Sequence, residues 1–283
     1  LLDSIKSEKR KNLLLQYFQL QARERQPISV KQLAETAQTS AAIVTALIDK
    51  QIFEEYFIQE DRVNFEKNKV NNEFSLSVAQ QTAFDEIVKS FVEKDVTLLH
   101  GVTSSGKTEI YTKLIENYIA LGKQVLYLLP EIALTTQLVS RLTKHFGNKV
   151  AVFHSKYSNN ERVEVWHQVL NSSDKAQVLI GARSALFLPF NNLGLIIVDE
   201  EHEQTFKQQD PAPRYHARDA AIVLANFHNT TRANPQASGE LARAKVLLGS
   251  ATPSIETYYN ANSEKFGLVI LKERFGKVPM PEI

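Results

Sequence analysis

The segment from Gly101 to Thr108 has the spacing of a phosphate-binding loop. It reads GVTSSGKT, in which two glycines separated by four residues precede a lysine and a threonine. In this pattern backbone N–H groups and the start of the next helix surround phosphate oxygens, the lysine reaches the β- and γ-phosphates, and the threonine hydroxyl binds Mg²⁺. We therefore predict a site for a nucleoside triphosphate with Mg²⁺. Its predicted residues are Gly101, Val102, Thr103, Ser104, Ser105, Gly106, Lys107 and Thr108.

Further along the chain, an apolar run ends in a cluster of acids. Leu195–Val198 is short enough to be a buried parallel strand, and the residues that follow read Asp-Glu-Glu-His. An acid at the carboxyl end of such a strand can hold the Mg²⁺, and the next carboxylate can orient or deprotonate an attacking water. We predict these roles for Asp199 and Glu200, with Lys107 as the third catalytic residue. The structural alternative is a helix N-terminus rich in acids.

The composition describes an ordinary globular protein and excludes several classes. With 283 residues the chain is long enough for two domains, and its formal net charge is only +1, so any nucleic-acid surface depends on local placement of Lys and Arg. It has no cysteines, which excludes disulfides and cysteine-bound zinc within these residues. No apolar run approaches the ~18 residues of a membrane span, and no signal peptide is evident. We expect a cytoplasmic protein with no membrane partner.

Residues 1–68 have the element order of a winged-helix domain. Helical spacing of apolar residues predicts helices over 9–25 and 30–37, and a third helix, capped by Thr39-Ser40, that runs through Ala42 to Ile48. Two short β-like runs, 53–58 and 62–65, follow. Such domains often bind DNA, but the third helix carries few cations. A spacer or docking role with weak phosphate contact is therefore favoured over base reading.

After a polar linker over 69–77, residues 78–283 alternate between strands and helices. The predicted strands are Thr97–His100, Gln124–Leu129, Val150–Phe153, Gln177–Ile180, Leu195–Val198 and Lys245–Leu248. This rhythm predicts an α/β domain with a parallel sheet and helices on both faces, in which ligands bind at the carboxyl ends of the strands. Residues 233–239 are expected to be an insertion.

Several other segments match the motifs of superfamily 2 helicases, for which the D-E-x-H form is typical. They are Leu76–Ala83 (with Gln80), Leu128–Thr135, Gly181–Phe187, Asp199–His202 and Gly249–Ser254. After the acidic cluster come Phe206–Gln209 (FKQQ) and Arg214–Asp219 (RYHARD). In combination, these segments resemble the replication-restart helicases of the PriA (primosomal protein N′) family.

The resemblance implies a RecA-like first helicase lobe of an ATP-driven 3′→5′ DNA helicase that reloads the replication machinery at stalled forks. It implies that Gln80 reads the adenine, and that Thr108 and Asp199 hold Mg²⁺. It also implies DNA contact, or coupling between DNA and ATP, for a set of residues. They are Thr135, Arg183, Ser184, Phe206, Lys207, Arg214, Tyr215, Ser250 and Thr252.

The same resemblance implies parts that these residues do not contain. The family carries an N-terminal DNA-binding domain, a second lobe, which supplies an arginine finger, and a cysteine-rich zinc insertion. We therefore expect little ATP turnover from this chain alone, and zinc only elsewhere in the parent protein. The implied partners are single-stranded and forked DNA, replication-restart proteins and single-strand-binding protein, with a monomeric chain.

Two positions depart from the family, and several alternatives stay open. Ser104 stands where the family usually has glycine, and Ala182 stands where it has threonine. The chain could be another superfamily 2 DNA translocase, although Arg214–Asp219 argues against it, or a nucleotide-dependent binding module without turnover. Phe206 and Tyr215 could be core aromatics, the motif residues near Thr135 and Arg183 could be loops that cap the sheet, and Ser250 and Thr252 could cap a helix.

Overall fold

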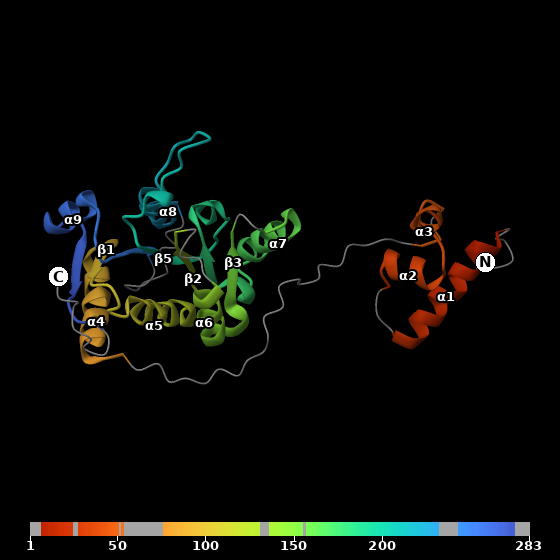
Figure 1. The fold of residues 1–283 in the computed structure, drawn as a ribbon, viewed down its shortest axis with the longest axis horizontal. Helices are drawn as coiled ribbons and strands as arrows, with labels where there is room; N and C mark the ends of the chain where they lie inside the picture. The colour runs from red at the N-terminus through yellow and green to blue at the C-terminus, as the bar shows by residue number, and fades with distance from the viewer. Residues whose placement is uncertain are drawn as a thin grey trace, which may run out of the picture. The chain divides into compact units, whose positions relative to one another are not determined.

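The computed structural model describes residues 7–24, 28–50, 52–53, 76–130, 136–154, 157–231 and 243–274. Its chain divides into two compact units, Leu1–Glu60 and Asp61–Ile283. The three predicted N-terminal helices are confirmed as α1 (Glu8–Glu24), α2 (Val30–Thr36) and α3 (Ala41–Ile48) (Figure 1). Leu13, Leu33 and Leu47 bury their side chains between them. Most of the predicted hairpin, and the linker up to residue 75, lie outside the described residues.

The second unit is built on a seven-stranded sheet in which every strand pairing is parallel. The strands are β1 (Val96–Gly101), β2 (Gln124–Leu128), β3 (Val150–Phe153), β4 (Val178–Gly181), β5 (Leu193–Asp199), β6 (Lys245–Ser250) and β7 (Gly267–Leu271). Their order is β3-β4-β2-β5-β6-β1-β7. The six predicted strands are confirmed within two residues at each end, whereas β7 was not predicted. Because β5, β6 and β1 are parallel neighbours, their carboxyl ends lie side by side at the same end of the sheet.

Helices cover both faces of this sheet, as predicted. They are α4 (Val78–Glu93), α5 (Lys107–Ala120), α6 (Thr136–Phe146), α7 (Asn159–Leu170), α8 (Ala217–Thr231) and α9 (Ile255–Asn262). Short 3-10 helices are η2 (Gly147–Lys149), η3 (Asp174–Ala176), η4 (Arg183–Phe187) and η5 (Gln204–Phe206). No helix in the described ranges has the length and apolar character needed to cross a membrane.

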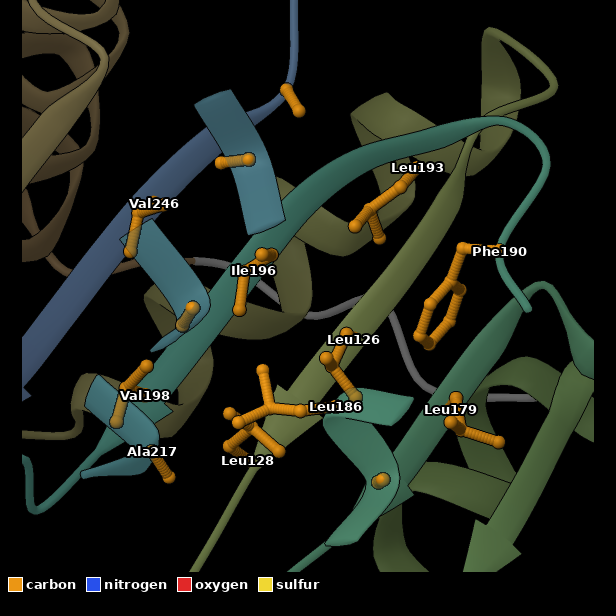
Figure 2. Close-up of a cluster of buried hydrophobic side chains, with 14 of the residues drawn as sticks. Leu126, Leu128, Leu179, Leu186, Phe190, Leu193, Ile196, Val198, Ala217 and Val246 are labelled. Atoms are coloured by element: carbon orange, nitrogen blue, oxygen red, sulfur yellow. The ribbon is translucent and has the colours of Figure 1, made fainter. Parts of the chain in front are cut away.

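Alternating residues of the strands divide the core into two clusters. On β2, Val125 and Tyr127 pack with residues of α4, α5 and α6, whereas Leu126 and Leu128 pack with residues of α7, α8 and α9. Figure 2 shows part of the second cluster, where Leu186 of η4 and Ala217 at the start of α8 lie among strand residues. Burial of both faces explains why the strands are almost continuously apolar.

Candidate nucleotide and nucleic-acid site

The predicted phosphate-binding loop joins the carboxyl end of β1 to the first residue of α5. Gly106 has a φ of +78°, and a Cβ there would lie 2.2 Å from Nε2 of Gln80. Both observations require glycine at this position. Ser104 has a φ of +63°, a conformation that costs a non-glycine residue free energy. The serine therefore occupies a position whose backbone favours the glycine usual in the family.

The side chains of the loop fit the phosphates of a nucleotide. The side chain of Lys107 is 9% exposed, and its ammonium donates to the carbonyl of Gly101 at 3.0 Å and lies 3.9 Å from Oε1 of Glu200. Within the described part of the chain, the buried hydroxyl of Ser105 has no hydrogen-bond partner. A buried cation, an unpaired hydroxyl and the amino end of a 14-residue helix meet here. All three are groups that bind phosphate oxygens.

Asp199 ends β5 and is held by two buried tyrosines. Tyr111 of α5 donates its hydroxyl to Oδ1 at 3.0 Å, and Tyr127 of β2 donates to Oδ2 at 3.1 Å. Burial raises the pKa of Asp199 to about 6, helped by the negative charge of Glu200 and opposed by Lys107 and the tyrosine hydroxyls. The ionised carboxylate is thus short of positive charge, which fits a site for Mg²⁺.

Glu200 has a strained backbone, and His202 connects the acidic cluster to the end of β6 and the residues that follow it. Glu200 has a φ of +50°, an uncommon conformation for a residue with a Cβ, and such strain is often found at functional sites. Nδ1 of His202 lies 2.8 Å from Oγ of Ser250, and Nε2 lies 3.3 Å from Oγ1 of Thr252. The predicted residues Ser250 and Thr252 are therefore brought to the acidic cluster itself, where they can link it to the start of α9.

Glu201 was not predicted as a site residue, yet it is fully buried and heavily hydrogen-bonded. Its carboxylate accepts from Nη1 of Arg218 at 3.3 Å, from the N–H and hydroxyl of Ser254 at 2.7 and 3.1 Å, and from the hydroxyl of Thr257 at 2.9 Å. Arg218 belongs to the first turn of α8, and Ser254 caps α9. Glu201 therefore fastens both helices to the acidic cluster.

Gln80 lies beside the phosphate-binding loop. Its Oε1 accepts from the N–H of Ser77 at 2.9 Å, which forms a capping box at the start of α4. Its Nε2 donates to the carbonyls of Ser105 and Gly106 at 3.1 and 3.4 Å. The amide thus joins the start of α4 to the loop, with Oε1 on Ser77 and Nε2 on the loop carbonyls, and adenine recognition by Gln80 stays a prediction.

Arg183 contacts the backbone where the segment between η5 and α8 begins. This segment spans residues 207–216. Its Nη1 donates to the carbonyls of Thr205 and Lys207 at 3.3 and 3.0 Å. Lys207 pairs with His216 in an isolated antiparallel bridge, and its Nζ donates to the carbonyl of Arg214 at 3.2 Å. These contacts close the segment into a loop that Arg183 holds in place.

The remaining predicted DNA or coupling residues occupy different environments. Phe206 is only 1% exposed and belongs to the core, as the alternative interpretation had it, so its ring is a support for the loop rather than a DNA-facing surface. Tyr215 and Ser184 are half-buried, and Thr135 lies outside the described residues. The ring of Tyr215 meets that of Phe187 edge to face, with centroids 5.1 Å apart.

With this geometry in place, comparison with known proteins identifies the family. A model of DEAD/DEAH box helicases matches residues 77–261. The chain belongs to the DEAD/DEAH box helicase family. A second model, described as the winged helix domain of PriA helicase from Bacteroidota, matches residues 1–59. This match confirms the predicted type of N-terminal domain.

Curated relatives of this helicase chain are called replication restart protein PriA. The protein of Bacillus subtilis (strain 168) is 38% identical over 94% of the chain, and that of Rickettsia felis is 42% identical over 80% of it. The chain spans about a third of the length of these relatives, 32% in both cases. They confirm the predicted resemblance to PriA.

Among solved structures, RecG bound to a three-way DNA junction matches with a TM-score of 0.50 and 18% identity. The match covers 95% of this chain and 30% of that chain. At this identity it supports the helicase fold alone.

Some residues that build the helicase site carried no signal in the sequence. Tyr111 and Tyr127 lie within a helix and a strand, where each fits the apolar pattern of a core residue. Arg218 stands in the sequence as one of the cations of the RYHARD segment, and Glu201 as the variable position of D-E-x-H. Arg218 stands near the start of a predicted helix, and Glu201 follows the end of a predicted strand. Their opposite charges are the one sequence feature that could have suggested a contact between them.

Proposed function

We propose that this chain is the winged-helix domain and the first, ATP-binding lobe of an ATP-driven 3′→5′ DNA helicase that restarts replication at stalled forks. The second lobe, with its arginine finger, and the zinc region are expected outside these 283 residues. The observation that carries the proposal is the meeting of the buried ammonium of Lys107 with the carboxylate of Glu200, at 3.9 Å, beside Asp199. The PriA relatives support the choice of replication restart among helicase functions.

Each residue of this edge has a proposed role. Lys107 and the loop N–H groups bind the phosphates, and the Thr108 hydroxyl and Asp199 hold the metal ion. Glu200 orients the attacking water and accepts its proton, while Gln80 recognises the adenine. When bound, Mg²⁺–ATP supplies the phosphoanhydride bond whose hydrolysis drives movement along DNA.

The proposed partners follow from the same assignment. They are single-stranded and forked DNA, single-strand-binding protein and other replication-restart proteins, met by a monomeric, cytoplasmic helicase. Arg183, Ser184 and the loop over 207–216 are proposed to lie next to the DNA. Ser250 and Thr252 are proposed to transmit its presence to the acidic cluster through His202.

The rate of ATP hydrolysis by a longer protein that contains this chain and the second lobe tests the proposal. We expect ATP turnover that forked DNA stimulates, and a loss of about 10²-fold or more in Glu200→Gln with nucleotide binding retained. Glu203→Gln is the matched control, because that half-buried carboxylate lies three residues further along the chain and has no proposed role. Wild-type turnover in Glu200→Gln would contradict the assignment. Nucleotide binding without any DNA-stimulated turnover would favour a non-catalytic binding module.

A further inference from the structure

Tyr127 places a hydroxyl inside the core of the sheet. The residue belongs to β2, which lies next to β5, and it pairs with Ile197, two residues before Asp199. Its side chain is fully buried, and its ring meets that of Tyr111 edge to face, with centroids 5.6 Å apart. A buried hydroxyl costs free energy unless it is hydrogen-bonded, so its partners indicate what the residue does.

The hydroxyl of Tyr127 has two partners, and both belong to the proposed nucleotide site. It donates to Oδ2 of Asp199 at 3.1 Å. It also forms a hydrogen bond with the hydroxyl of Thr108, the second residue of α5. A tyrosine has one hydroxyl proton, and here the carboxylate accepts it, so Thr108 must be the donor in the second bond. Tyr127 therefore joins Thr108 to Asp199 in a chain of two hydrogen bonds that run in the same direction.

The direction of this chain decides what Thr108 can offer to a cation. Burial and the negative charge of Asp199 raise the pKa of Tyr127 well above its ordinary value, so its hydroxyl stays protonated at neutral pH. The proton of Thr108 is therefore directed to Tyr127, and the lone pairs of the Thr108 oxygen stay available for a ligand. Metal ligands are commonly oriented in this way by hydrogen-bond partners behind them.

Tyr111 holds the other oxygen of Asp199 in a different way. It donates to Oδ1 at 3.0 Å, and Oδ1 also accepts the N–H of Glu200 at 3.1 Å. Oδ1 therefore keeps a donor when Tyr111 loses its hydroxyl. Oδ2, in contrast, has Tyr127 as its donor within the described part of the chain. The two tyrosines are equally buried and differ in what each one connects.

We propose that Tyr127 is a positioning residue for the metal ion of the nucleotide site, which turns the hydroxyl of Thr108 so that its oxygen can bind Mg²⁺ and ties it to Asp199. The inference rests on the proposed nucleotide-binding function, because it concerns how residues of this chain meet Mg²⁺. Tyr127 acts through Thr108 and Asp199 rather than on the nucleotide itself. The contribution of Mg²⁺ to nucleotide affinity should therefore depend on one oxygen atom of a core tyrosine.

Calorimetric titration of the chain with ADP, once in EDTA and once in excess Mg²⁺, tests the proposal. We expect Tyr127→Phe to bind ADP in EDTA with the wild-type affinity, because Lys107 and the loop N–H groups are unchanged. The gain in ADP affinity on adding Mg²⁺ should fall by about 10-fold or more, as it does when other residues behind metal ligands are changed. Tyr118→Phe is the matched control. That tyrosine of α5 is also buried, but its hydroxyl has no hydrogen-bond partner within the described residues.

Two further variants distinguish the hydrogen-bond chain from a general effect of tyrosines near Asp199. Tyr111→Phe should keep most of the gain from Mg²⁺, because Thr108 stays bonded to Tyr127. Thr108→Val should lose the gain, and Tyr127→Phe in that background should have no further effect, since the two residues act in sequence. Strictly additive losses in this double variant, or equal losses in Tyr111→Phe and Tyr127→Phe, would overturn the proposal.

The remaining outcomes separate this proposal from the function on which it rests. A wild-type gain from Mg²⁺ in Tyr127→Phe, with ADP binding lost in Lys107→Ala, would overturn the role of Tyr127 and leave the nucleotide site standing. Loss of ADP binding by Tyr127→Phe in EDTA as well as in Mg²⁺ would mean that the hydroxyl supports the whole loop, and would equally overturn that role. No ADP binding by the wild type would contradict the nucleotide site and the proposal together.

Discussion

At the scale of single residues, Ser104 has a backbone conformation in the phosphate-binding loop that is unfavourable for a residue with a Cβ. Its φ of +63° costs an L-residue about 1–2 kcal/mol, whereas glycine adopts it freely. Glycine also loses more backbone entropy on folding, roughly 0.5–1 kcal/mol. We therefore expect Ser104→Gly to raise the free energy of unfolding by up to about 1 kcal/mol in urea denaturation. Thr103→Gly, an exposed neighbour without positive φ, should lower it instead. Equal losses in both variants would contradict the strain argument.

Gly249 is the residue that lets Tyr111 reach Asp199. A Cβ at position 249 would lie 1.8 Å from the Tyr111 hydroxyl and 3.3 Å from Oδ1 of Asp199. We expect Gly249→Ala to lower the free energy of unfolding by about 1–3 kcal/mol, because the tyrosine must move. Tyr111→Phe in the same chain removes the closest atom and leaves a ring carbon at 2.9 Å. The double variant should recover part of the loss, and strictly additive losses would show that the two side chains do not collide.

The sequence indicated the proposed reacting residues of the site better than the residues that position them. Lys107, Thr108, Asp199 and Glu200 stand in motifs whose spacing has a chemical meaning, and the structure brings Lys107, Asp199 and Glu200 together. The hydroxyl of Tyr111 reaches Asp199 across 88 residues of sequence, and no local pattern encodes such a contact. The positive φ at Ser104 had one hint, the glycine usual in the family at that position, because a serine by itself does not indicate backbone strain.

At the scale of elements, Glu201 and Arg218 join three segments, which are the acidic cluster after β5, the start of α8 and the start of α9. Glu201 is fully buried, Arg218 nearly so, and they share Ser254 at the start of α9. Removing Glu201 leaves several buried donors without their acceptor, among them the Ser254 N–H and the Thr257 hydroxyl, although Arg218 keeps Asp219 and Glu256 as partners. We therefore expect Glu201→Ala to lower the free energy of unfolding by about 3 kcal/mol or more, since each unsatisfied buried polar group costs about 1–3 kcal/mol.

The control for this prediction uses an exposed carboxylate that pairs with the same arginine. Glu256 accepts from Nη2 of Arg218 at 2.7 Å, but its side chain is 69% exposed. Glu256→Ala should therefore cost less than about 1 kcal/mol in the same denaturation experiment. Similar losses for the two variants would mean that the cluster is not a buried joint between the acidic cluster, α8 and α9.

Element-level prediction succeeded where the hydrophobic pattern was regular and failed at β7. Leu195–Val198 and Gln124–Leu129 are apolar runs bounded by polar residues, and both are strands. Gly267–Leu271 is also apolar, but five such residues fit a buried helix segment equally well. Its parallel pairing with β1, far away in sequence, decides the matter, and that pairing is a tertiary effect.

At the scale of the whole molecule, a net charge of +1 limits how the chain can bind DNA. In the part of the chain that the structure describes, local cations such as Arg183, Lys207 and Arg214 lie near the proposed DNA track. We expect the affinity for single-stranded DNA to fall with salt with a logarithmic slope of about two to four, measured by fluorescence anisotropy. A slope near ten would contradict this account, because it would require a large basic surface that these residues do not form.

The central claim is that the loop from Gly101 to Thr108 binds a nucleotide through Lys107, and calorimetric titration of the chain with Mg²⁺–ADP tests it most directly. We expect measurable binding by the wild type. Lys107→Ala should lose about 10-fold or more in affinity, because charge-assisted hydrogen bonds to phosphate are lost. Lys113→Ala is the control, since that lysine lies on the same helix but pairs with Glu116 at 2.8 Å and should not matter. Unchanged affinity in Lys107→Ala, or no binding by the wild type, would contradict the account.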